Sequence, residues 1–246
     1  MSRVCRVTVV SPHFDDAPLS LGQSMLDGSL SRCRVRVEVL FGRTNYTRWV
    51  HPTRARARAI SLWRRGEEAL AQARFGYRVH SHDLEEAVLR TGELDPDVIR
   101  DAGTDPVGDP TFGDVVARLR RLRGAGGLFL VPVGLGDHLD HRIVAEAGRR
   151  LAREHDDGIG FYEDRPYASV LQPDEIADQV ARLGLDLEPV TVSGPISASM
   201  HRWLRRCYPS QIDDRFAEWL DRDSAEGAVE RVWLPAGQVP GWLRFD

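Results

Sequence analysis

The chain has 246 residues, of which 42% are hydrophobic and 28% charged, as is typical of a globular protein. Its formal net charge is −4 at pH 7, so no overall basic field would draw it to nucleic acid or to an anionic membrane surface. The N-terminal segment has no signal-like apolar core, and no apolar stretch approaches the roughly 20 residues of a membrane span. We therefore expect no nucleic-acid partner, no membrane partner and a cytoplasmic location.

The three cysteines, Cys5, Cys33 and Cys207, are odd in number and far apart in the sequence. They form no Cys-x-x-Cys pair, so we expect neither a disulfide framework nor a cysteine zinc site. This pattern fits a reducing compartment best, in agreement with a cytoplasmic protein.

Short β-rich runs alternate along the chain with segments of helical spacing. Strands are expected at residues 3–10, 34–41 and 127–133, with weaker ones at 158–162 and 189–193. Helices are expected at residues 19–26, 53–75, 112–123 and 141–155. Because strands that alternate with helices form βαβ units, we predict an α/β fold with a largely parallel sheet and helices on both faces. Neither a repeat nor a linker is visible, so a single domain over residues 1–246 is expected.

Two loops stand out by their lack of periodicity. Residues 91–112 are rich in proline, glycine and aspartate, and loops of this length are often lids or binding segments. Neither this segment nor residues 43–58 carries a pattern from which a substrate can be predicted.

Acidic and histidine-bearing segments follow two of the predicted strands. The first carries His13, Asp15 and Asp16, and the second, residues 134–142, carries two histidines and two aspartates. Because open α/β sheets bind ligands beyond the carboxyl ends of their strands, both segments can converge on one cleft.

The spacing within these segments suggests different tasks for their side chains. Residues three apart in a helical turn lie on one side, so His13 and Asp16 can reach one ion together. By the same spacing His138 and His141 can face a common cavity, whereas Asp15 must point elsewhere.

Two histidines and one carboxylate with an open position are typical of a catalytic zinc site, where the pKa of water falls to about 7. An unligated carboxylate beside that water is suited to act as general base. Asp16 would therefore hold the metal, and Asp15 would take the proton of the water.

These motifs resemble those of a known family. His13-Phe-Asp-Asp16 before a turn of small residues and Gly22, with His138-Leu-Asp-His141 after a later strand, resembles the LmbE-like, or PIG-L, family of zinc-dependent N-deacetylases. Weaker similarities to family elements are found in Arg64-Arg-Gly-Glu67, Tyr162-Glu-Asp-Arg-Pro-Tyr167 and Tyr208-Pro-Ser-Gln211. The resemblance covers most of the chain and implies a Rossmann-like fold.

The resemblance also implies roles for individual residues. His13, Asp16 and His141 would bind one zinc ion, although other divalent metals are open, and Asp15 would activate water. His138 would polarise the oxyanion or protonate the departing amine.

The resemblance extends to residues beyond the expected metal ligands and also shows two departures from the family pattern. Asp140, outside the metal shell, would orient an imidazole through a hydrogen bond, and Arg64 would contact the substrate. Phe14 and Ala17 stand where the family commonly has proline and glutamate. Since neither is an expected ligand, the chemistry is retained, but the missing glutamate suggests a branch with its own substrate.

The implied activity is metal-assisted removal of an N-acetyl, or another N-acyl, group from an amino-sugar-containing small metabolite. The partner would be an N-acetylated sugar or glycoconjugate, including a precursor of an antibiotic-type metabolite. Two other classes remain open: a non-haem iron(II) oxygenase with His13, Asp15 and His141 as ligands, and a non-catalytic binding protein on the same fold. The sequence does not decide whether the chain forms a homo-oligomer.

Overall fold

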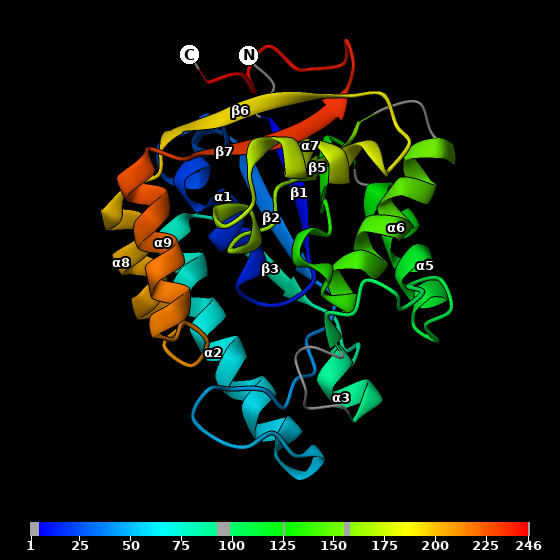
Figure 1. Cartoon of the computed structure of the whole chain (residues 1–246), viewed down its shortest axis with the longest axis vertical. Helices are drawn as coiled ribbons and strands as arrows, with labels where there is room; N and C mark the ends of the chain where they lie inside the picture. The colour runs from blue at the N-terminus through cyan, green and yellow to red at the C-terminus, as the bar shows by residue number, and fades with distance from the viewer. Residues whose placement is uncertain (1–4, 93–98, 125, 155–157, 246) are drawn as a thin grey trace.

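The computed structural model describes residues 5–92, 99–124, 126–154 and 158–245. Its seven strands form one sheet in the order β3-β2-β1-β4-β5-β7-β6, shown in Figure 1. The strands are β1 Arg6–Ser11, β2 Arg34–Val39, β3 Arg78–Ser81, β4 Leu128–Pro132, β5 Ile159–Tyr162, β6 Leu187–Pro195 and β7 Val229–Pro235. The first five are mutually parallel, and β7 is antiparallel to both β5 and β6. The prediction of a largely parallel sheet is confirmed.

Helices cover both faces of this sheet, as predicted. They are α1 Asp16–Leu26, α2 Ala57–Phe75, α3 Ala87–Thr91, α5 Phe112–Arg123, α6 Leu139–Glu154, α7 Pro173–Ala181, α8 Ala198–Cys207 and α9 Asp214–Glu226. Short 3₁₀ turns lie at η1 Ser29–Arg32, η2 Arg54–Arg56, η3 Leu135–Asp137 and η4 Tyr167–Ser169. The expected helix 141–155 begins two residues earlier than predicted, while its residue 155, residues 3–4 of the first expected strand and residues 93–98 of the expected loop lie outside the described residues.

Alternation along the strands produces two hydrophobic cores. Val7 and Val9 of β1 pack with α1, α2 and α8, whereas Val10 faces the opposite side with α5, α6 and α7. Because successive side chains of a strand point to opposite faces, a strand buried on both sides must be apolar throughout. The helices of the two layers lie on opposite sides of the sheet in Figure 1.

The cysteine expectation is wrong, because Cys5 and Cys33 form a disulfide with their Cα atoms 4.8 Å apart. They are 28 residues apart in sequence, yet each directly precedes one of two neighbouring parallel strands, in which Arg6 pairs with Arg34. Cys207 is a buried free thiol. The cysteines therefore no longer argue for a reducing compartment. Within the described ranges, no helix is long and apolar enough to cross a membrane.

Candidate metal centre

The two histidine-bearing segments meet at the carboxyl ends of β1 and β4, which are adjacent parallel strands. His13 lies in the connection after β1, and Asp16 is the first residue of α1. His141 lies in the first turn of α6, three residues after His138. The sheet thus brings together residues that are more than 120 positions apart in the sequence.

Three ligand-type atoms face one another at this point. Asp16 Oδ2 lies 3.3 Å from His13 Nδ1 and 3.3 Å from His141 Nε2, and a set of ligand atoms from these residues fits within 4.8 Å. A tetrahedral zinc shell with bonds of about 2.0–2.1 Å separates its ligand atoms by about 3.3–3.4 Å. The arrangement therefore suits a small divalent metal ion.

Each of these two rings is held by a second carboxylate through its other nitrogen. His141 Nδ1 lies 2.6 Å from Asp164 Oδ1, and His13 Nε2 lies 3.0 Å from Asp140 Oδ2. Both aspartates are fully buried. Such carboxylate–histidine pairs fix the ring and leave the opposite nitrogen free to bind a metal, which is the usual environment of a metal-binding histidine.

A competing group, His13, His138 and Asp140, is also compact enough to hold an ion. In that group, however, Asp140 Oδ1 already pairs with Arg90 at 2.9 Å, and Oδ2 accepts the Ala87 amide at 2.8 Å. Both Asp140 oxygens are therefore already engaged, whereas Asp16 Oδ1 has no partner among the described contacts. The group that contains Asp16 is therefore the better metal site.

The electrostatics of the centre favour positive charge. Burial disfavours a charged ring at His13, but Asp16 and Asp140 outweigh it and raise the pKa of His13 to about 10. Burial likewise opposes charge on His141, and Asp16 and Asp164 raise its pKa to about 10. Despite burial, the two rings hold the pKa of Asp16 well below its usual range. A metal ion would meet the same negative surroundings once these protons leave.

Asp15 pairs with α2 and with none of the three metal-ligand candidates in the described contacts. Its Oδ1 lies 2.9 Å from Arg64 Nη2, and Arg64 Nη1 lies 3.0 Å from Glu67 Oε2. Arg64 is only 3% exposed, so this guanidinium is enclosed between two carboxylates although it borders the cleft. Asp15 and Asp16 thus have different partners.

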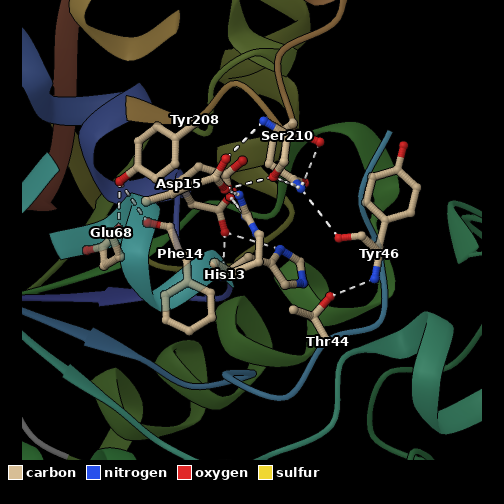
Figure 2. A network of polar contacts seen from close by, with 12 residues as sticks. His13, Phe14, Asp15, Thr44, Tyr46, Glu68, Tyr208 and Ser210 are labelled. Carbon is tan, nitrogen blue, oxygen red and sulfur yellow. Dashed lines mark hydrogen bonds and ion pairs between the residues drawn. The ribbon is translucent and has the colours of Figure 1, made fainter. Parts of the chain in front are cut away.

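The chain near Tyr208 supports the loop that carries His13, as Figure 2 shows. The Tyr208 hydroxyl lies 3.1 Å from the Phe14 carbonyl and 2.6 Å from Glu68 Oε2. Glu67, which directly precedes Glu68 in α2, accepts hydrogen bonds from the amide and hydroxyl of Ser210 at 2.9 and 2.7 Å. The weak sequence elements around 64–67 and 208–211 thus contact each other.

His138 presents one ring nitrogen to the cleft. Its Nδ1 accepts the Asp140 amide at 3.2 Å, so Nε2 carries the proton of the neutral ring. Burial, followed by the nearby His13 ring, holds the pKa of His138 well below its usual range.

The tight turn that precedes His138 requires glycine. At Gly136 the φ angle is 74°, and a Cβ would lie 2.1 Å from the Tyr167 ring.

A cleft of about 420 Å³ opens above these residues. Its rim is aromatic and charged, and both uncharacterised loops contribute to it. Besides the metal-ligand candidates, Asp15, Arg64 and His138, its walls include Tyr46, Glu86, Ile99, Arg100, Tyr167, Gln211, Asp213, Arg215, Phe216 and Trp219. Phe14 and Ala17, in contrast, are buried in a hydrophobic core.

Sequence reasoning missed several functional candidates. Asp164 was visible only as part of a weak family element, although it binds His141 and accepts the amides of Gly134 and Leu135 at 2.8 and 3.2 Å. Glu86 had no sequence signal, yet it is buried beside the cleft. Burial, opposed mainly by His13, raises its pKa to about 7.

The chain matches no family model. It is 30% identical over 262 residues to the 2'-N-acetylparomamine deacetylase of Streptomyces fradiae, covering 94% of this chain and 90% of that protein. Among solved structures, the zinc-inhibited form of teicoplanin deacetylase Orf2 is 18% identical, with a TM-score of 0.63 over 93% of this chain and 97% of that one. N,N'-diacetylchitobiose deacetylase from Pyrococcus horikoshii is 13% identical, with a TM-score of 0.53 over 94% and 84%.

The structural likenesses show the fold, and the identity to the Streptomyces fradiae enzyme extends over almost the whole of both chains. The motifs at His13–Asp16 and His138–His141 predicted the same relationship. The chain belongs to the LmbE-like, or PIG-L, family and is a deacetylase that hydrolyses an amide.

Proposed function

We propose that the protein is a zinc-dependent hydrolase that removes an N-acetyl group from an amino-sugar-containing small metabolite. The observation that carries this proposal is the compact group of His13, Asp16 and His141 beneath a cleft that also holds Asp15 and His138. The relative that acts on 2'-N-acetylparomamine supports an aminoglycoside-type N-acetylated sugar as the first substrate class to test.

We assign the metal to His13, Asp16 and His141. The equal separations of Asp16 Oδ2 from the two rings and the two buried carboxylates behind those rings support this choice. A zinc ion bound there supplies Lewis-acid polarisation of the acyl carbonyl and lowers the pKa of nearby water. Asp140, as the partner of His13 Nε2, orients a ligand rather than binding the metal itself.

Asp15 accepts the proton of the attacking water. Arg64 contacts its Oδ1, so Oδ2 is the oxygen left for the water among the described contacts. Arg64 was expected to contact the substrate, but its pairing with Asp15 and Glu67 favours a positioning role. It would act on the reaction by fixing the direction of the general base.

His138 donates a hydrogen bond from Nε2 to the oxygen on which negative charge develops, because Nδ1 is already used as an acceptor. When the water oxygen bonds to the acyl carbon, the carbonyl double bond opens and its electron pair moves to the carbonyl oxygen. The carbon–nitrogen bond breaks when that double bond re-forms. Acetate and a free amine leave, and the amine takes up the proton that Asp15 removed.

The oxygenase alternative requires Asp15 as a metal ligand. Asp15 instead pairs with Arg64, while Asp16 is equidistant from both rings, so the geometry counts against that alternative. The cytoplasmic location and the absence of nucleic-acid and membrane partners stay predictions, and the oligomeric state stays open.

Metal analysis of the purified protein, combined with an amine-release screen, tests the proposal. We expect about one zinc ion in the centre and release of acetate and primary amine from N-acetylated aminoglycoside fragments. If the chelator-stripped protein turned these substrates over at the full rate, the zinc-dependent mechanism would be wrong. If the loaded protein deacetylated only substrates without a sugar, the substrate class would be wrong.

A further inference from the structure

A second group of metal-ligand side chains lies at the β3 edge of the sheet. Glu38 on β2 is paired in register with His80 on the neighbouring parallel strand β3, and His82 follows two residues later. Residues paired in register project to the same face, as do residues two apart on an extended strand. The topology therefore places one carboxylate and two imidazoles together, in a combination to which the deacetylase mechanism assigns no role.

The three side chains converge on a single oxygen atom. Glu38 Oε2 lies 3.1 Å from His80 Nδ1 and 2.9 Å from His82 Nε2, and a set of ligand atoms from the three residues fits within 4.8 Å. Two of the three separations are thus within about 0.5 Å of those in a tetrahedral zinc shell.

The two oxygens of the buried Glu38 carboxylate have different partners. Glu38 is fully buried on β2, although the neighbouring His80 side chain on the edge strand β3 is 56% exposed. Its Oε1 forms an ion pair with the half-exposed Arg36 but no hydrogen bond among the described residues. A buried carboxylate is costly unless it is paired or binds a metal, and a divalent ion at Oε2 would add a second positive partner to the half-exposed Arg36. The exposure of His80 gives an ion a route from solvent, and Arg36 contacts the oxygen that the rings do not share.

We propose that Glu38, His80 and His82 form a second metal site, separate from the deacetylase centre, for a divalent ion of the zinc class. Two imidazoles with one carboxylate suit Zn²⁺, Ni²⁺ or Cu²⁺ rather than the oxygen-preferring Mg²⁺ and Ca²⁺. The bound ion ties the edge strand β3 to β2. This proposal does not depend on the substrate or on the deacetylase mechanism.

The test is the zinc stoichiometry of chelator-stripped full-length protein, measured by equilibrium dialysis against Zn²⁺ followed by metal analysis. We expect two ions per wild-type chain and one in the double variant His80→Ala/His82→Ala, with its deacetylase activity unchanged. The exposed His51 provides the matched control, and His51→Ala should keep two ions. If the double variant fails to fold, the single variant His80→Ala, which changes an exposed side chain, should show the same loss.

The outcomes separate this site from the proposed active site. One ion in the wild type that disappears in His141→Ala, but stays in the double variant, would refute the second site and leave the proposed function intact. Two ions in the double variant would also refute it. One ion that disappears only in the double variant would support the second site and contradict the candidate metal centre.

Discussion

The carboxylate behind His141 offers a sharp test, because Asp164→Asn keeps the size of the side chain and changes only its hydrogen bonding. Asp164 Oδ1 accepts from the His141 ring, while Oδ2 accepts the amides of Gly134 and Leu135. An asparagine has one acceptor oxygen for these two groups of donors. If the oxygen faces the backbone amides, the NH₂ group forces His141 Nδ1 to accept, and the ring proton moves to Nε2.

That tautomer cannot bind a metal through Nε2. If the asparagine turns over instead, its NH₂ group meets the two backbone N–H groups, which are then left without an acceptor. Loss of such an outer partner typically lowers metal affinity about 10- to 100-fold, or about 1.4–2.7 kcal/mol. Leaving buried donors unpaired costs the fold about 1–3 kcal/mol.

The assay is a chelator competition titration with Zn²⁺, run beside thermal unfolding of the stripped protein. We expect weaker zinc binding in Asp164→Asn and little change in Glu163→Gln, which alters the adjacent buried carboxylate that bonds to Trp233 and not to a metal-ligand candidate. Equal zinc affinity in Asp164→Asn and wild type would refute the reasoning on the His141 tautomer.

Three further changes have defined outcomes. Asp15→Asn should keep zinc and lower turnover by about 3–5 kcal/mol in barrier, and full activity in a steady-state assay would rule out this base. Burial raises the pKa of Glu68 from 4.5 to about 8, so the folded state binds a proton that the unfolded chain releases, and stability should fall as pH rises through this range. Glu68→Gln should flatten that dependence in thermal unfolding from pH 5 to 8, and parallel curves would contradict it. Because the bond between Cys5 and Cys33 closes a 28-residue separation, Cys5→Ser should lower the free energy of unfolding by about 3–4 kcal/mol in denaturant titrations, whereas equal stability would show that the bond is not formed.

The metal-ligand candidates could be predicted because their spacing is local. His13 and Asp16 are three residues apart, as are His138 and His141, and each pair lies within a few residues of the end of an apolar strand. The rule that ligands bind at the carboxyl ends of parallel strands then brings the two pairs together. The choice of His141 over His138 as the third ligand came from the family resemblance.

Their partners could not be predicted, because they are set by tertiary contacts. Asp164 reaches His141 from the end of β5, and Arg64 reaches Asp15 from the middle of α2. On an amphipathic helix an arginine usually faces solvent, so its enclosure between two carboxylates depends on how the helix packs.

Three further misses have the same origin. Strand β7 was not predicted, because Glu230 occupies one of its inward positions and interrupts the apolar alternation. There Glu230 accepts hydrogen bonds from the amides of Gln23 and Ser24 at 2.8 and 2.7 Å. The cysteine pair depends on strands β1 and β2 being neighbours in register, which a 28-residue separation does not reveal. The pairing of Glu38 with β3 was hidden because β3 itself was not predicted.

Zinc-edge anomalous diffraction from crystals of the zinc-loaded protein tests the central claim most directly, because it locates the ion without reference to activity. We predict an anomalous peak within bonding distance of His13 Nδ1, Asp16 and His141 Nε2, with Asp15 nearby but outside bonding distance. A peak bonded to Asp140 and His138 instead, or no peak at this end of the sheet, would contradict the account.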